Sequence, residues 1–551
     1  MRAGSSIEIV GASSDSGQRS AIAGQTRRHA KYVKSIAAAL LLCFAAVPAH
    51  AEKIVRAVLN TELQVLDPIA TTINATRVFA YLVFDQLVGI DNQGKYHPQM
   101  LEGWQISDDK LTYTFKLRDG LLWSDGTPVT AADCVASIKR WGKRDGFAKN
   151  LMAMTKDVRP TGDKTFVLEL TQPFAFVIEA LGKPGNNVPV MMPARLAATD
   201  PATAIKEPIG SGPFTFRQSE WRPGELAIFD RNPNYKPRPE PADGLSGGKK
   251  VNVDRVEIIN QPDVTTRMVA LQSGEVDLLE YIPFDYIVPM RNERKIVIAP
   301  QRGVEQMLQA LSLNHVQPPF NNVLARRAVQ AALDQEEVMA SLGLPEDMYL
   351  KKCLSIYMCN AAGTSDSGLE YYKEVGMDRA KALLKESGYK GEPVVLLHAA
   401  TSASLNPTGL VEADILKRIG FNVDIRTSDF ATIAARRTSK APASEGGWSA
   451  IPIIWNGIDL VNPLSDPAVS NNCNEYNPGW YCDKELTDLL RQYAVAPDEE
   501  QRRDLAAQIQ KAFHRNVNFV LGGQLSAPTA YRADLKGVIP FAFPVFWSMD
   551  R

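Results

Sequence analysis

The stretch LTYTFKLRDGLLWSDGTPVTAADCVASIKRW, from Leu111 to Trp141, carries the local signals that best define the fold of this chain. Its first seven residues alternate apolar and polar side chains, which predicts a strand with one buried face. Two Asp-Gly pairs, at 119–120 and 125–126, predict tight turns. Thr130, followed three residues later by Asp133, predicts a helix start with a reciprocal cap.

The predicted helix carries four apolar side chains on one face, at Cys134, Val135, Ile138 and Trp141. Because the acids of this stretch fit turn and cap positions, we expect structural roles for them rather than catalysis. Cys134 is expected to be a buried free thiol, and the alternative is a reactive one.

Strands and helices alternate again further along the chain. PVVLLHAA, residues 393–400, predicts a buried strand, and LVEADILKRI, residues 410–419, predicts a helix that stops at Gly420. FNVDIRT, residues 421–427, predicts the next strand. This order implies a right-handed crossover and a parallel pair of strands in an α/β lobe.

Three other patterns give local expectations. Asp378 is expected to cap the helix that ends at Gly388, and Asp498 is expected to cap an amphipathic helix near the end of the chain. The stretch from Lys236 to Lys250 is rich in Pro and Gly and predicts a surface loop.

The first 51 residues have the pattern of an extension followed by a secretory signal. A basic segment (Arg27, Arg28, Lys31 and Lys34) precedes the apolar run 36–48, and AHA at 49–51 supplies small residues for cleavage before Glu52. The run is too short for a membrane anchor, since a spanning helix needs about 20 residues. A lipid anchor on Cys43 and a twin-arginine signal are weaker alternatives. We expect the mature protein to be exported and periplasmic.

Cysteine spacing agrees with export. Cys353 and Cys359 lie close in sequence, and so do Cys473 and Cys482, which favours two short-range disulfides in an oxidising compartment. A zinc site made of the four thiolates is the alternative, but neither pair has the usual metal spacing.

The composition and the motifs argue against several classes of function. The formal net charge is −1, from 61 basic and 62 acidic residues, so no nucleic-acid partner is expected. No nucleophile elbow, zinc-protease motif or phosphate-binding loop is present, and the four histidines after residue 51 are scattered. We therefore predict neither an enzyme nor a cofactor or metal.

The stretch from Leu111 to Trp141 closely resembles the signature region of family 5 extracellular solute-binding proteins, which are receptors of ABC importers for dipeptides, oligopeptides and nickel. Further blocks that resemble this family follow in family order at Leu66–Pro68, Tyr81–Asp91, Pro208–Phe216, Arg231–Arg238, Ala270–Glu280 and Leu311–Asp334.

The resemblance implies an α/β, two-lobed periplasmic-binding-protein-like fold with a hinge and an extra inserted domain. After the signal region at 1–51, lobe I would comprise residues 52–91, 208–304 and 520–551. The inserted domain II would span 92–207, and lobe III would span 305–519.

The resemblance also implies a function. The protein would capture a peptide or a related amine-bearing solute between its lobes, and would deliver it as a monomer to the membrane permease of an ABC importer. One alternative is a receptor for a nickel complex or another non-peptide solute, such as an opine or an oligosaccharide. A more distant alternative is a secreted hydrolase.

By the same resemblance, WNGIDLVNP, residues 455–463, corresponds to the segment whose aspartate pairs with the ammonium group of the ligand. Asp459 is the candidate for that role, with Trp455 as an apolar wall and Asn456 as a donor and acceptor; a turn cap is the alternative for Asp459. Five weaker candidates lie in two other ligand segments: Thr61, Glu62, Leu63, Thr401 and Ser402. The second of these segments lacks the arginine that some dipeptide receptors carry, so a strict dipeptide ligand is not implied.

Overall fold

The computed structural model describes residues 52–359, 361, 364–474 and 478–551, so the predicted signal segment lies outside the described residues. Three larger sheets and one short two-stranded sheet are present in this part of the chain. None of its helices is both long and apolar enough to cross a bilayer.

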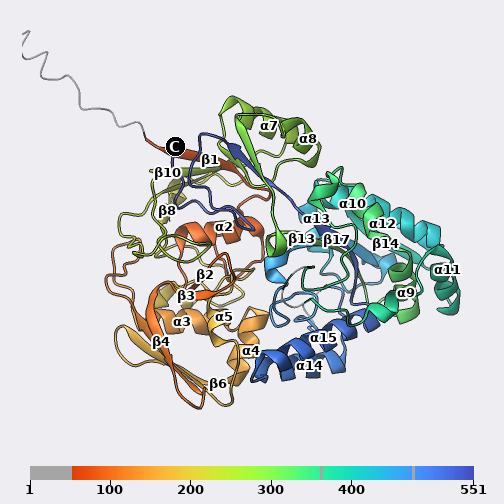
Figure 1. Ribbon diagram of the computed structural model, residues 1–551, viewed down its shortest axis with the longest axis horizontal. Helices are drawn as coiled ribbons and strands as arrows, with labels where there is room; N and C mark the ends of the chain where they lie inside the picture. Colours follow the sequence, from red (N-terminus) through yellow and green to blue (C-terminus); the bar gives the residue numbers. More distant parts are fainter. Residues whose placement is uncertain (1–51, 360, 362–363, 475–477) are drawn as a thin grey trace, which may run out of the picture. The chain divides into compact units, whose positions relative to one another are not determined.

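The seven-stranded sheet combines strands from distant parts of the chain (Figure 1). Its strands, in spatial order, are β12 (Ile296–Ala299), β18 (Thr529–Arg532), β11 (Leu278–Leu279), β1 (Ile54–Val58), β10 (Arg255–Ile259), β9 (Leu226–Arg231) and β8 (Phe214–Phe216). β1 runs parallel to both of its neighbours, whereas β18 is antiparallel to β11 and to β12. Strand β18 therefore joins β12 to the rest of the sheet.

The five-stranded sheet contains the predicted strand–helix–strand unit. Its order is β15 (Asn422–Ser428), β14 (Pro393–Ala399), β16 (Ala450–Asn456), β13 (Met307–Leu313) and β17 (Phe519–Leu525). β14 and β15 are parallel, and α12 (Leu405–Ile419) connects them and ends at Gly420 in the left-handed conformation. The predicted parallel pair is confirmed, although the helix begins five residues earlier than expected.

The four-stranded sheet has the order β4 (Leu101–Ile106), β5 (Thr112–Leu117), β7 (Thr165–Leu170) and β6 (Thr155–Pro160), and all its pairs are antiparallel. A further pair is formed by β2 (Val88–Ile90) and β3 (Tyr96–Pro98). Each larger sheet takes its strands from the segments predicted for one lobe or domain, with one exception: β17 belongs to the five-stranded sheet, but all of its residues after Phe519 fall in the segment predicted for lobe I. The domain boundaries themselves stay a prediction.

The helices have the following bounds: α2 Asn74–Val83, α3 Ala131–Trp141, α4 Gly146–Met154, α5 Val177–Leu181, α6 Ala194–Ala197, α7 Val264–Ser273, α8 Ile287–Met290, α9 Val323–Ala332, α10 Gln335–Ala340, α11 Met377–Glu386, α13 Phe430–Arg436, α14 Lys484–Val495 and α15 Glu499–Asn516. Figure 1 shows α9 to α12 gathered around the five-stranded sheet.

The stretch that opened the sequence analysis folds as its local signals predict. In β5 the side chains of Tyr113, Phe115 and Leu117 are buried and the intervening ones are not. The Thr130 side chain accepts from the Asp133 backbone N–H, and the Asp133 carboxylate accepts from the Thr130 backbone N–H at 2.9 Å. This reciprocal cap starts α3, so Asp133 has the predicted structural role.

The cysteines also have the predicted states. Cys353 and Cys359 form a disulfide with a Cα–Cα distance of 5.7 Å, and Cys473 and Cys482 form another at 4.2 Å. Cys134 is a buried free thiol, and burial raises its pKa. A raised pKa keeps this thiol protonated and unreactive.

Two local predictions are wrong. Asp378 does not cap its helix: α11 begins after Gly376, whose positive φ of 115° lets the chain turn without a side-chain cap. The loop from Lys236 to Lys250 is buried in its second half, from Gly244 to Lys249. The Lys249 ammonium donates to Asp85 at 2.8 Å, and it lies 4.9 Å from the ring centre of Trp547, so a buried ion pair replaces the expected solvent contact.

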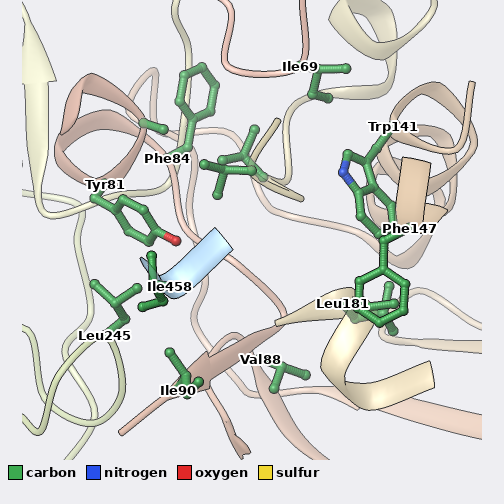
Figure 2. Close-up of a cluster of buried hydrophobic side chains, with 14 of the residues drawn as sticks. Ile69, Tyr81, Phe84, Val88, Ile90, Trp141, Phe147, Leu181, Leu245 and Ile458 are labelled. Atoms are coloured by element: carbon green, nitrogen blue, oxygen red, sulfur yellow. The ribbon is translucent and has the colours of Figure 1, made fainter. Parts of the chain in front are cut away.

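The largest buried cluster joins side chains from all three predicted parts of the protein. Figure 2 shows Ile458, which follows β16, in a cluster with Tyr81, Leu245 and Ile90. Packing of this one residue therefore brings the segment around Asp459 against helix α2 and its surroundings.

Candidate ligand site

Asp459 ends a short 3-10 helix, Gly457–Asp459, directly after β16. Ile458 anchors this turn in the large apolar cluster, so the neighbouring carboxylate is carried inside with it. Asp459 is only 4% exposed. A carboxylate buried to this extent needs charged or hydrogen-bonding partners.

The charged partner of Asp459 is Arg77 of helix α2, 382 residues earlier in the sequence. Arg77 Nη1 donates to the two carboxylate oxygens of Asp459 at 3.4 and 3.3 Å. Both side chains are almost fully buried. The contact therefore pairs a cation of predicted lobe I with an anion of predicted lobe III.

The Arg77 guanidinium is fixed on its other side. Its Nε donates to Asn74 Oδ1 at 3.1 Å, Nη2 donates to the same oxygen, and its central carbon lies 4.8 Å from the ring centre of Phe543. Asn74 in turn donates to the buried Glu280 carboxyl group. This network holds the guanidinium so that Nη1 faces Asp459.

A third segment reaches Asp459 from predicted domain II. The backbone N–H of Asn186 donates to Asp459 Oδ1 at 3.1 Å, and Asn186 Nδ2 donates to Oδ2 at 3.4 Å. The neighbouring Gly185 leaves room for this approach, because a Cβ atom there would overlap Asp459 Oδ1. Asp459 thus lies where three predicted parts of the chain meet.

Two other acids lie near this network. Burial raises the pKa of Glu280, although the Asn60 backbone N–H donates to it at 2.7 Å. Burial also raises the pKa of Asp466, and the nearby charge of Asp459 adds to the effect. A raised pKa shifts each of these two carboxyl groups toward its neutral form, whereas the Asp459 carboxylate contacts the Arg77 guanidinium directly.

The other two residues of the predicted Trp-Asn-Asp group lie just before this turn. Trp455 is partly buried and packs edge-to-face on Phe519, with ring centres 5.0 Å apart. Among the described residues, no donor reaches the buried Oδ1 atom of Asn456. Trp455 and Asn456 are the last two residues of β16, the strand that leads to Asp459.

The segment with Thr61, Glu62 and Leu63 lies elsewhere in predicted lobe I. Thr61 Oγ1 accepts from the Ala75 backbone N–H at 3.2 Å, next to Asn74 in α2. All three residues line a recess of about 290 Å³ together with residues of β9 and β10, among them Leu226 and Ile259. The recess does not include Asp459.

Thr401 and Ser402 accept hydrogen bonds from the starts of two helices. Thr401 Oγ1 accepts from the Phe430 backbone N–H at 3.1 Å, and Ser402 Oγ accepts from the Leu405 backbone N–H at 3.3 Å. These bonds fix the start of α12 and of α13. In the described part of the chain neither side chain hydrogen-bonds to Asp459, so a role in binding stays a prediction.

Sequence reasoning missed Arg77 and Asn186. Arg77 gave one usable signal: it is the charged residue in NATRVFAYLV, a helix in which nine of ten residues are buried. A charge inside such a helix needs a buried partner. Asn186 gave no comparable signal, because its partner depends on how the parts of the chain pack.

Within the described residues, no group of three His, Cys, Asp or Glu side chains could hold a metal ion. The arrangement around Asp459 instead brings together one carboxylate, one guanidinium and one side-chain amide.

Comparisons with known proteins find matches over most of the chain. Residues 95–471 match the model of bacterial extracellular solute-binding proteins, family 5 Middle. A probable peptide ABC transporter periplasmic-binding protein of Sinorhizobium fredii is 37% identical over 507 residues, which cover 91% of this chain and 94% of the relative.

Solved structures show the same fold at low sequence identity. The periplasmic binding protein DppA of Helicobacter pylori, in complex with the peptide STSA, has a TM-score of 0.75 at 20% identity, over 92% of this chain and 99% of that one. AgaA of A. tumefaciens R10, in complex with agropinic acid, has a TM-score of 0.74 at 22% identity, over 90% and 96% of the two chains. The predicted two-lobed α/β fold is therefore confirmed.

Proposed function

Because the chain belongs to family 5 of the bacterial extracellular solute-binding proteins, we propose that it is the substrate-binding receptor of an ABC importer. It captures a peptide or a related amine-bearing solute and passes it to a membrane permease. The Sinorhizobium relative, with its probable role in peptide transport, supports this class of solute. The protein acts outside the cytoplasmic membrane, after cleavage before Glu52, and works as a monomer.

The observation that carries the proposal is the buried carboxylate of Asp459, reached by Arg77 and by Asn186. By our proposed boundaries, these residues belong to lobe III, lobe I and domain II. A solute that binds at this meeting point touches both sides of the hinge. Only such a solute can drive closure, because it must bind the closed form more tightly than the open form.

The binding residues then have distinct roles. The Asp459 carboxylate accepts hydrogen bonds from the ammonium group of the solute, and burial makes such a charge-assisted bond stronger than it would be in water. Trp455 forms an apolar wall, and Asn456 Oδ1, which has no donor in the described part of the chain, accepts a further hydrogen bond from the solute. Thr61, Glu62, Leu63, Thr401 and Ser402 remain weaker candidates for outer contacts.

The proposal is tested by ligand-dependent stability. At a ligand concentration of 100 times Kd, mass action adds about 2.7 kcal/mol to the stability of the native state. We expect one or more members of a peptide library to raise the Tm, and mass spectrometry of the native protein to identify any solute that co-purifies. The same peptide should be recovered intact after prolonged incubation.

Asp459→Asn keeps the shape of the side chain and removes its charge, so it should abolish the rise in Tm. Asp504→Asn, at an exposed position of α15, is the control and should bind as the wild type does. A library that leaves the Tm unchanged in both the wild type and Asp459→Asn would refute the proposed function.

A further inference from the structure

The pair formed by Arg77 and Asp459, which joins predicted lobe I to lobe III, differs from the buried pair of Arg140 and Asp67, which joins domain II to lobe I. In that second pair, Arg140 donates to Asp67 through two nitrogens at 3.1 and 2.7 Å, and the Asp67 carboxylate also accepts from two backbone N–H groups at 3.0 and 2.9 Å. Its distances are those expected of a strong charged bond.

Asp459 is held more loosely. Three of its four contacts, two from Arg77 and one from Asn186 Nδ2, have lengths of 3.3 or 3.4 Å. Only the bond from the Asn186 backbone N–H is shorter, at 3.1 Å. A carboxylate and a guanidinium thus face each other across the meeting point of three segments, without the close geometry of a structural pair.

The positions of these two charges restrict what can bind beside them. A solute with only an ammonium group would place a second cation next to the buried Arg77 guanidinium when it reached Asp459. Like charges in a site that excludes water repel strongly. Arg77 cannot move away easily, because Asn74 and Phe543 hold its other side.

A solute with an ammonium and a carboxylate on one carbon avoids this repulsion. Its ammonium can approach Asp459 while its carboxylate approaches Arg77, so that the four charges alternate in sign around a ring. An α-amino acid head group presents its two charges about as far apart as the facing groups of Arg77 and Asp459, which are separated by 3.3 Å. Asn456 Oδ1, three residues before Asp459, accepts no hydrogen bond from the described residues and offers a further acceptor for the ammonium.

We infer that Arg77 is a specificity-determining residue, and that the site formed by Arg77 and Asp459 selects solutes with a free α-amino-carboxylate head group. This inference rests on the proposed function and specifies its solute class. Peptides with such a head group include those joined through the γ-carboxyl group of glutamate. Ordinary peptides lack it, because their first α-carboxyl group is part of an amide.

Two isomeric probes separate these classes: γ-glutamylalanine and α-glutamylalanine. They have the same atoms and the same net charge, but only the γ isomer keeps its ammonium and a carboxylate on one carbon. We expect isothermal titration calorimetry to show that the wild type binds the γ isomer at least about tenfold more tightly, in line with the effect of a buried charge pair.

Arg77→Met should lose the preference and bind both isomers alike, whereas Arg77→Lys keeps the cation and should retain part of it. Arg327→Met is the control, since Arg327 is a half-buried helix arginine that, like Arg77, lies over an aromatic ring, and it should keep the preference. The Tm of each variant without ligand shows whether it folds.

Equal binding of the two isomers by the wild type, or an unchanged preference in Arg77→Met, would overturn the inference. Binding of ordinary peptides with no binding of the γ isomer would overturn it as well. If the wild type bound no amine-bearing solute of any kind, the proposed function itself would fail, and that result is distinct from a failure of selectivity.

Discussion

Glu412 of helix α12 is predicted to make the stability of the protein fall as the pH rises through neutrality. Its side chain is fully buried beneath the five-stranded sheet, and Gln309 Nε2 donates to its Oε1 atom at 2.8 Å. The other carboxyl oxygen has no partner among the described residues. Burial raises the pKa of Glu412 from 4.5 to about 8.

The sign and the size of the effect follow from this pKa. Below about pH 4.5 the group is protonated in both the folded and the unfolded state, and the full stability is present. Between about pH 4.5 and 8 the unfolded state ionises while the folded state holds its proton, so stability is lost at about 1.4 kcal/mol per pH unit. The loss approaches about 5 kcal/mol as an upper bound and levels off above about pH 8.

Urea unfolding at a series of pH values from 5 to 9 (roughly the range over which the loss should occur) measures this directly. Glu412→Gln cannot ionise, so the wild type should lose stability relative to this variant by several kcal/mol across the series. Glu500→Gln, at an exposed position in the first turn of α15, is the control and should follow the wild type. If the free energy of unfolding changed with pH in the same way for the wild type and Glu412→Gln, the reasoning would be refuted.

The other predictions concern single features of the structure. Gly185→Ala should abolish ligand binding in the calorimetric assay, because the added methyl group would overlap Asp459 Oδ1, the proposed acceptor for the ammonium group of the ligand. Gly103→Ala, at a position with open space around it, should bind normally in the same assay. Replacing both cysteines of the Cys473–Cys482 disulfide by serine should cost about 2–3 kcal/mol in urea unfolding, from the entropy of a short closed loop; an unchanged midpoint would contradict this. Cys134 should react with iodoacetamide only in denaturant, as followed by mass spectrometry, and labelling of the native protein would show that the thiol is reached by solvent.

Features that depend on neighbours in sequence could be predicted well. The strand, the turns and the capped helix between Leu111 and Trp141 depend on local alternation, Asp-Gly pairs and a three-residue cap spacing. The two disulfides were also predictable, because each closes a short loop. In these cases the interacting residues are close along the chain, so the pattern contains both partners.

Features that depend on distant partners could not be predicted from local patterns. The Pro- and Gly-rich composition of residues 236–250 suggested a surface loop, but the Asp85 partner of Lys249 lies 164 residues away. Asp459 was found through resemblance, yet its cation, Arg77, lies 382 residues away in helix α2, for which no prediction was made. Such pairs depend on tertiary packing, which a single sequence does not report.

The position of β18 has a consequence for the order of folding. Strand β12 is joined to the seven-stranded sheet through β18, which lies more than 200 residues later in the chain. The sheet therefore cannot be completed until residues 529–532 have been synthesised, even though its central strand β1 is made first. In a chain with this topology the largest sheet stays open, with the place of β18 unfilled, during most of the synthesis of the protein.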